Sequence, residues 1–74
     1  MMLEFVEGDI RPIYGVRVVH VDNREAFLKL AKRYAKENGG IIFRISTNTA
    51  DVFKFFAKGT IFVYIKKKRG VRNE

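Results

Sequence analysis

The chain has 74 residues, enough for one small domain, and its 15 Lys and Arg against 8 Asp and Glu give a formal net charge of +7. A hydrophobic content of 47% with seven Phe and three Tyr argues against a disordered chain, and the absence of Cys excludes disulfides and Cys-ligated zinc. No apolar run approaches the roughly 20 residues of a membrane-spanning helix. We therefore expect a soluble, cytoplasmic protein with no membrane partner, of a composition compatible with a thermophilic source.

The first part of the chain predicts two strands joined by a loop. Residues 2–7 alternate weakly between apolar and polar side chains, which indicates a short strand ending at Gly8. Pro12 disfavours helix at Arg11, and the glycines at 8 and 15 mark the ends of a loop. Residues 16–21 (VRVVHV) are rich in β-branched side chains and predict a second strand.

The clearest predicted element is a helix that follows the second strand. Asp22 with Glu25 three residues later resembles a capping box, and Gly39 and Gly40 predict an end near Asn38. One side of this helix gathers apolar residues, namely Phe27, Leu30, Ala31, Tyr34 and Ala35. The opposite side carries a stripe of cations at one-turn spacing, namely Lys29, Lys32, Arg33 and Lys36.

The second half of the chain predicts a strand, a second helix and a final strand. Residues 41–46 (IIFRIS) and 60–66 (TIFVYIK) have the composition of strands. Between them, residues 46–49 (STNT) offer helix N-caps and Gly59 suits a helix end, so we predict a helix from about Thr49 to Lys58. Its apolar side chains cover more than half of the helical wheel, which predicts a deeply packed helix.

The predicted fold is therefore one α+β domain over residues 1–65, in the order β-β-α-β-α-β, with a basic, flexible tail over residues 66–74. We expect a four-stranded mixed sheet with both helices on one face. One face of the two later strands is purely aliphatic or aromatic and is the expected core face: Ile41, Phe43, Ile45, Ile61, Val63 and Ile65. The other face is expected to stay open: Ile42, Arg44, Ser46, Thr60, Phe62, Tyr64 and Lys66.

Three groups of residues indicate a polyanionic partner. The cationic stripe of the first helix could follow a phosphate backbone, although a solvated outer face explains it too. The last nine residues carry +4 of the net charge, and Lys66, Lys67, Lys68 and Arg69 could add phosphate contacts or simply keep the terminus soluble. On the open face, Phe62 and Tyr64 beside Arg44 and Lys66 could stack nucleobases, or the same face could be buried in a homodimer.

Catalytic chemistry finds little support in this sequence. His20 and Ser46 are the only His and Ser, they lie on different predicted strands, and the acids are scattered along the chain. We expect neither an enzyme nor a metal, cofactor or small-molecule substrate. The sequence favours a small basic protein that binds DNA or RNA mainly through phosphates and with little sequence preference. The alternative is a protein-interaction module or homodimer whose charge serves solubility.

Overall fold

The computed structural model describes residues 3–11, 14–38 and 40–68, without the side chains of residues 36–38. Within these residues the chain forms five strands and one helix. In chain order they are β1 (Glu4–Glu7), β2 (Arg17–His20), α1 (Arg24–Asn38), β3 (Ile41–Ser46), β4 (Ala50–Ala57) and β5 (Thr60–Lys67). The predicted arrangement of four strands and two helices is therefore wrong, although the fold remains a small α+β domain.

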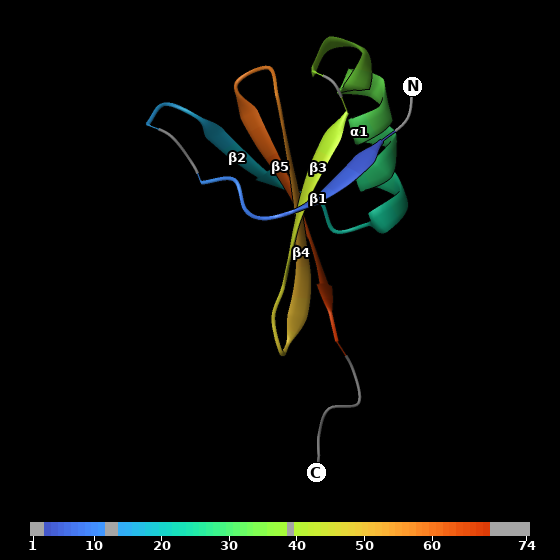
Figure 1. Ribbon diagram of the computed structural model, residues 1–74. Coiled ribbons are helices and arrows are strands. Elements are labelled where there is room, and N and C mark those ends of the chain that lie inside the picture. Colours follow the sequence, from blue (N-terminus) through green and yellow to red (C-terminus); the bar gives the residue numbers. More distant parts are fainter. Residues whose placement is uncertain (1–2, 12–13, 39, 69–74) are drawn as a thin grey trace.

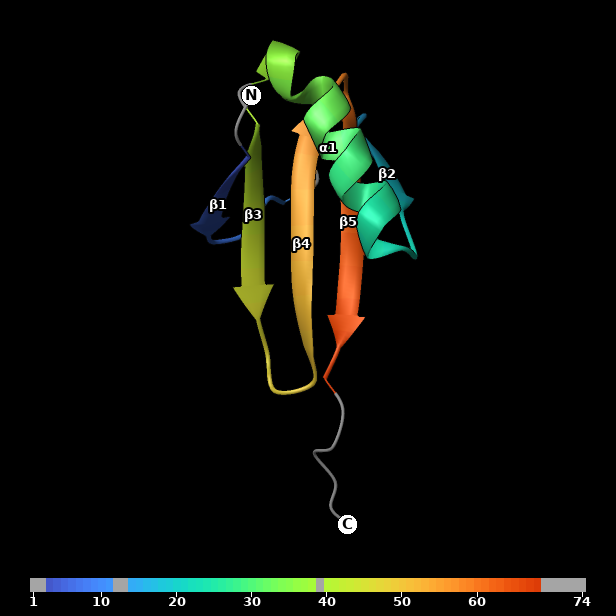
Figure 2. The same cartoon turned by 90° about the vertical axis from the view of Figure 1, so that its right-hand side faces the viewer.

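All five strands belong to one mixed sheet in the order β1-β3-β4-β5-β2 (Figures 1 and 2). β3, β4 and β5 form an antiparallel meander, and the two short edge strands pair in parallel, β1 with β3 and β2 with β5. The first two strands thus lie at opposite edges. The chain between them has to cross the whole sheet before β2 begins.

The segment predicted as a second helix is β4, the central strand. The expected helix caps build a turn instead, because the Thr47 hydroxyl accepts hydrogen bonds from the amides of Thr49 and Ala50 at 3.3 and 3.0 Å. At the other end Lys58 and Gly59 have φ angles of 49° and 71°. Positive φ at both central residues is typical of the type I′ turn that joins β-hairpins, so these residues lead into β5 and do not end a helix.

Helix α1 begins one residue later than the predicted capping box implies. The Asn23 side chain, and not that of Asp22, accepts a hydrogen bond from the Ala26 amide at 3.0 Å. The first intrahelical bond follows, from the Phe27 amide to the Asn23 carbonyl at 2.9 Å. Asn23 is therefore the N-cap, a position that Asn fills well.

The helix packs on the sheet face that the sequence predicted to be open. We call this the helix face. Buried Phe27, Ala31 and Ala35 of α1 meet Ile42 of β3 and Phe55 of β4, and Figure 2 shows α1 lying across the upper parts of β4 and β5. Small alanines on the helix allow a close approach to the large aromatic side chains of the sheet, so the aromatic face forms the better core.

The opposite face of the sheet is crossed by the segment after β1. We call residues 8–11 the strap and this face the strap face. Lys54 of β4 points to this side, where its ammonium pairs with the Asp9 carboxylate at 2.9 Å and donates to the Ile10 carbonyl at 3.3 Å. In Figure 1 the strap and α1 lie on opposite sides of the sheet. Ile61 and Val63, both buried, lie on the strap face.

Two neighbouring phenylalanines of β4 test this fold directly. Phe55 is 4% exposed against α1, whereas Phe56 is 43% exposed on the strap face. Phe55→Ala is expected to lower the free energy of unfolding by about 3–5 kcal/mol, enough to unfold a small domain. Phe56→Ala should cost much less, as measured by urea or thermal denaturation. Equal losses at both positions would contradict the strand assignment, because a deeply packed helix would bury both rings.

Candidate nucleic-acid interface

Part of the helix face extends beyond α1 and is open. β2 pairs only with Thr60–Val63 of β5, so the chain leaves the sheet halfway along β5 and α1 runs back from that level. Figure 2 shows the lower ends of β3, β4 and β5 projecting past the first turn of the helix. We call this uncovered region of the helix face the open half.

Three aromatic rings from three strands meet where the open half borders the helix. Phe5 of β1 stands edge-on to Phe53 of β4 with ring centroids 6.2 Å apart, and Phe53 stacks with Tyr64 of β5 at 5.9 Å. Phe5 is 51% exposed. A shallow hollow beside these rings is lined also by Arg24 at the start of α1. Aromatic surface next to a guanidinium is therefore accessible here.

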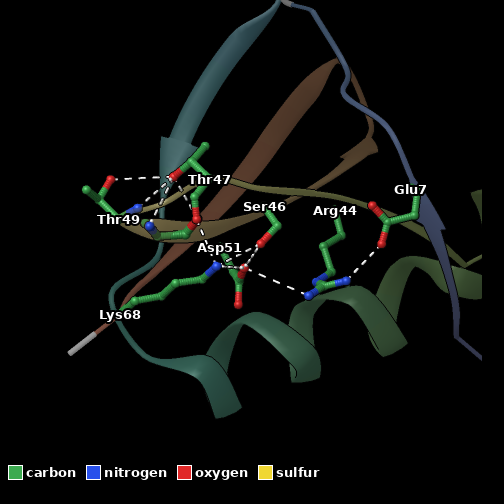
Figure 3. Close-up of polar contacts among 8 residues, drawn as sticks. Glu7, Arg44, Ser46, Thr47, Thr49, Asp51 and Lys68 are labelled. Atoms are coloured by element: carbon green, nitrogen blue, oxygen red, sulfur yellow. Dashed lines mark hydrogen bonds and ion pairs between the residues drawn. The ribbon is translucent and has the colours of Figure 1, made fainter. Parts of the chain in front are cut away.

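A cluster of charged and hydroxyl side chains continues the open half towards the β3–β4 turn (Figure 3). Arg44 lies between two acids, with its guanidinium 2.8 Å from Glu7 and 3.8 Å from Asp51. Asp51 also lies 3.7 Å from the ammonium of Lys68, which donates to the Ser46 hydroxyl at 3.0 Å. These exposed pairs add little stability, but they hold Arg44 and Lys68 on the same side of the sheet.

The same cluster lowers the pKa of Asp51 below its ordinary value of 3.8. The largest cause is the Ser46 hydroxyl, which donates to the carboxylate at 2.6 Å, and Lys68, Arg44 and Lys66 add their positive charge. Partial burial opposes the shift. The carboxylate of Asp51 is therefore charged at neutral pH, where it partly neutralises the cations around it.

The structure brings together some of the predicted binding residues and separates others. Arg44, Tyr64 and Lys66 share the open half, as their spacing along β3 and β5 implies. Phe62 lies under α1, stacked between Tyr34 at 5.8 Å and Phe55 at 4.8 Å. Its ring is part of the core, so we leave it out of the candidate interface.

The predicted basic residues of the helix and tail lie in three places. Lys29, Lys32 and Arg33 are exposed on the outer side of α1, while the side chain of Lys36 is outside the described part of the chain. Lys66 and Lys67 belong to β5, where side chains alternate, so Lys67 lies on the strap face. The Lys68 amide still bonds to the Thr49 carbonyl at 2.9 Å. Arg69 and the rest of the predicted tail lie outside the described residues.

Sequence reasoning missed Phe5, Phe53 and Arg24 as members of this surface. Phe53 was assigned to a helix, and without β4 nothing linked β1 to β5. The signal that could have found it is the Lys58-Gly59 pair between two apolar runs, which predicts a hairpin and so places Phe53 beside Tyr64.

A metal site and a membrane-spanning helix are both absent from the described residues. No group of three or more His, Asp or Glu side chains lies close enough together there to hold a metal ion. Helix α1 is too short and too polar to cross a membrane.

Comparison of the chain with known protein families, with curated proteins and with solved structures gave no match.

The lowered pKa of Asp51 predicts that the free energy of unfolding falls at acid pH. The pKa of Asp51 is lower in the folded chain than in the unfolded chain, so its carboxylate stabilises the fold at pH values above the unfolded-state pKa of about 3.8. This stabilisation is lost as the pH falls from that value through the pKa of the folded chain. Asp51→Asn should lower the free energy of unfolding at pH 7 and converge on the wild type near pH 2, as measured by urea denaturation across pH. Some acid dependence should remain, because Lys54 also lowers the pKa of Asp9.

The matched control is Glu7→Gln, which breaks the more exposed ion pair of Arg44 and should change stability less than Asp51→Asn. Parallel pH curves for wild type and Asp51→Asn would contradict a role for this carboxylate in the folded state.

Proposed function

We propose that the protein binds nucleic acid, DNA or RNA, mainly through phosphate contacts and with little sequence preference, and that the open half receives a single strand. The observation that carries the proposal is the half-exposed Phe5 ring, packed on Phe53 beside Tyr64, with Arg24 lining the same hollow. Arg44 and Lys66 lie further along the open half. The net charge of +7 supports a polyanionic partner. A cytoplasmic location is part of the same proposal.

The chemistry of this surface favours single strands over duplexes. Unpaired bases can lie flat on exposed aromatic rings while cations track the backbone, and this kind of binding tolerates any sequence because every base has a π-face. A duplex hides those π-faces within its stack. The exposed cations of α1 (Lys29, Lys32 and Arg33) could add phosphate contacts from beside the open half.

The acids of the open half set a limit on affinity. Glu7 and Asp51 partly neutralise Arg44 and Lys68, so the cations attract phosphate less than isolated ones would. We therefore expect moderate affinity with clear salt dependence, and a substantial share of the binding free energy from base stacking on Phe5.

Phe5→Ala tests the stacking role. Loss of one stacked base costs about 1–3 kcal/mol, so binding of a fluorescent single-stranded oligonucleotide should weaken by about 5- to 150-fold in anisotropy titrations. Phe5→Tyr should bind as the wild type does. The matched control is Tyr14→Ala, which removes a fully exposed aromatic side chain from the loop before β2 and should leave affinity unchanged.

The cations are tested by salt titration of the same complexes. Lys66→Gln should weaken binding of all sequences alike and reduce the slope of log affinity against log salt by about one. If Phe5→Ala and Lys66→Gln bind normally while Lys29→Gln does not, the interface lies on the outer side of α1 and not on the open half. Absence of wild-type binding near physiological salt would overturn the proposed function.

A further inference from the structure

Two acids lie in the open half, although a surface that holds phosphates only loses affinity through them. Glu7 of β1 and Asp51 of β4 both pair with Arg44. Asp51 has a structural role, because its partly buried carboxylate accepts a hydrogen bond from the Ser46 hydroxyl at 2.6 Å beside the β3–β4 turn. The Glu7 side chain is 74% exposed, and within the described chain its carboxylate bonds to Arg44 alone. Such an exposed ion pair adds little stability, so Glu7 requires another explanation.

Glu7 lies directly beside the exposed ring of the open half. Phe5 and Glu7 are two residues apart on β1, so both side chains project from the helix face, about 7 Å apart along the strand. Phe5 reaches across β3 to meet Phe53 of β4, with ring centroids 6.2 Å apart. A base stacked on Phe5 therefore has the Glu7 carboxylate within reach of its edge.

Glu7 and Arg44 together present hydrogen-bond acceptors and donors side by side (Figure 3). The two residues are neighbours across β1 and β3, and Nη1 of Arg44 donates to Oε2 of Glu7 at 2.8 Å. This bond orients the carboxylate but uses only part of its capacity, because a carboxylate offers about four acceptor positions and a guanidinium five N–H donors. Among the described residues none donates to Oε1. The pair therefore keeps free acceptors and donors next to the aromatic rings.

We propose that Glu7 and Arg44 select guanine as the base stacked on Phe5, an inference that rests on the proposed function. The Watson–Crick edge of guanine carries two adjacent donors, N1–H and the 2-amino group, next to the acceptor O6. A carboxylate beside a guanidinium matches this pattern, with Glu7 accepting from both donors and Arg44 donating to O6. The preference concerns this one base, and the rest of the strand is held through its phosphates.

The other bases do not match the pair. Adenine and cytosine each offer the carboxylate one amino group, and the ring nitrogen beside that group is an acceptor, which repels Glu7. Uracil and thymine have a single N–H between two carbonyls, so a carbonyl oxygen would face the carboxylate. Since Glu7 also repels phosphates, its position in the open half favours binding only when the stacked base is guanine.

The test compares short single-stranded oligouridylates that differ in one central base, G, A or C, by fluorescence anisotropy at constant salt. We expect the G strand to bind at least about 5-fold more tightly than the A and C strands, the lower end for a bidentate base contact, because Glu7 is exposed to water. A strand with inosine, which lacks the 2-amino group, should lose most of this preference. A strand with 7-deazaguanine, which keeps the whole Watson–Crick edge, should bind as the G strand does.

Two substitutions on β1 locate the contact. Glu7→Gln replaces one acceptor oxygen by an amide donor and should remove the preference for guanine without weakening the binding of the A and C strands. Glu4→Gln is the matched control, because Glu4 is also exposed but lies beside Ile41 on the strap face, and the preference should remain. Both variants lose one negative charge, so a difference between them reports the base contact and not the general attraction of phosphates.

Failure of this inference is distinguishable from failure of the proposed function. Equal binding of the G, A and C strands by the wild type would overturn the selection of guanine and leave nucleic-acid binding standing. Binding of none of them near physiological salt would overturn both. A guanine preference that persists in Glu7→Gln, or that Glu4→Gln removes equally, would overturn the role of Glu7. So would a preference for RNA over DNA strands of any base that Glu7→Gln abolishes, since it would place Glu7 at the 2′-hydroxyl.

Discussion

The short parallel pairing of β2 with β5 determines most of this structure. Only four residues of β2 pair with β5, from Thr60 to Val63, and the chain then turns at Asn23 into α1. Since β3 starts at the far end of the sheet, the helix has to run back over the part of the sheet that β2 already flanks. The 15 residues of α1 span about 22 Å, close to the length of β4, but their placement leaves the lower part of β4 and β5 bare.

The other edge strand imposes the same limit on the other face. β1 pairs with Ile41–Arg44 of β3, and the strap leaves the sheet at the level of Arg44 to reach the start of β2. Both connections therefore cross the same half of the sheet. The remaining half of the β3–β4–β5 meander is bare on both faces, with aromatic rings and cations on one and Ile45, Val52 and Ile65 on the other. The open half and the bare surface behind it thus arise from a single constraint on chain path.

Local patterns in the sequence predict those elements whose signals lie in their own residues or in the residues next to them in the chain. The strand at residues 41–46 and the helix ending at Asn38 are confirmed, because β-branched runs and glycine stops do not depend on distant contacts. β4 could not be recognised in this way. Its Phe53, Phe55 and Phe56 fit a buried helix as well as a strand, and only pairing with β5 places Phe55 inside and Phe56 outside.

The predicted core face was wrong for the same reason, and this error also left part of the candidate site unrecognised. Ile41, Phe43 and Ile45 look more apolar than Ile42 and Arg44, so β3 alone favours the wrong face. Once β4 lies between β3 and β5, its Phe55 and Ala57 add to Phe62 on the helix face, and the larger aromatic volume attracts the helix. Arg44 and Tyr64 could be assigned to one surface from spacing alone. Phe5 could not, because its place beside Phe53 depends on a parallel pairing between residues about 37 positions apart.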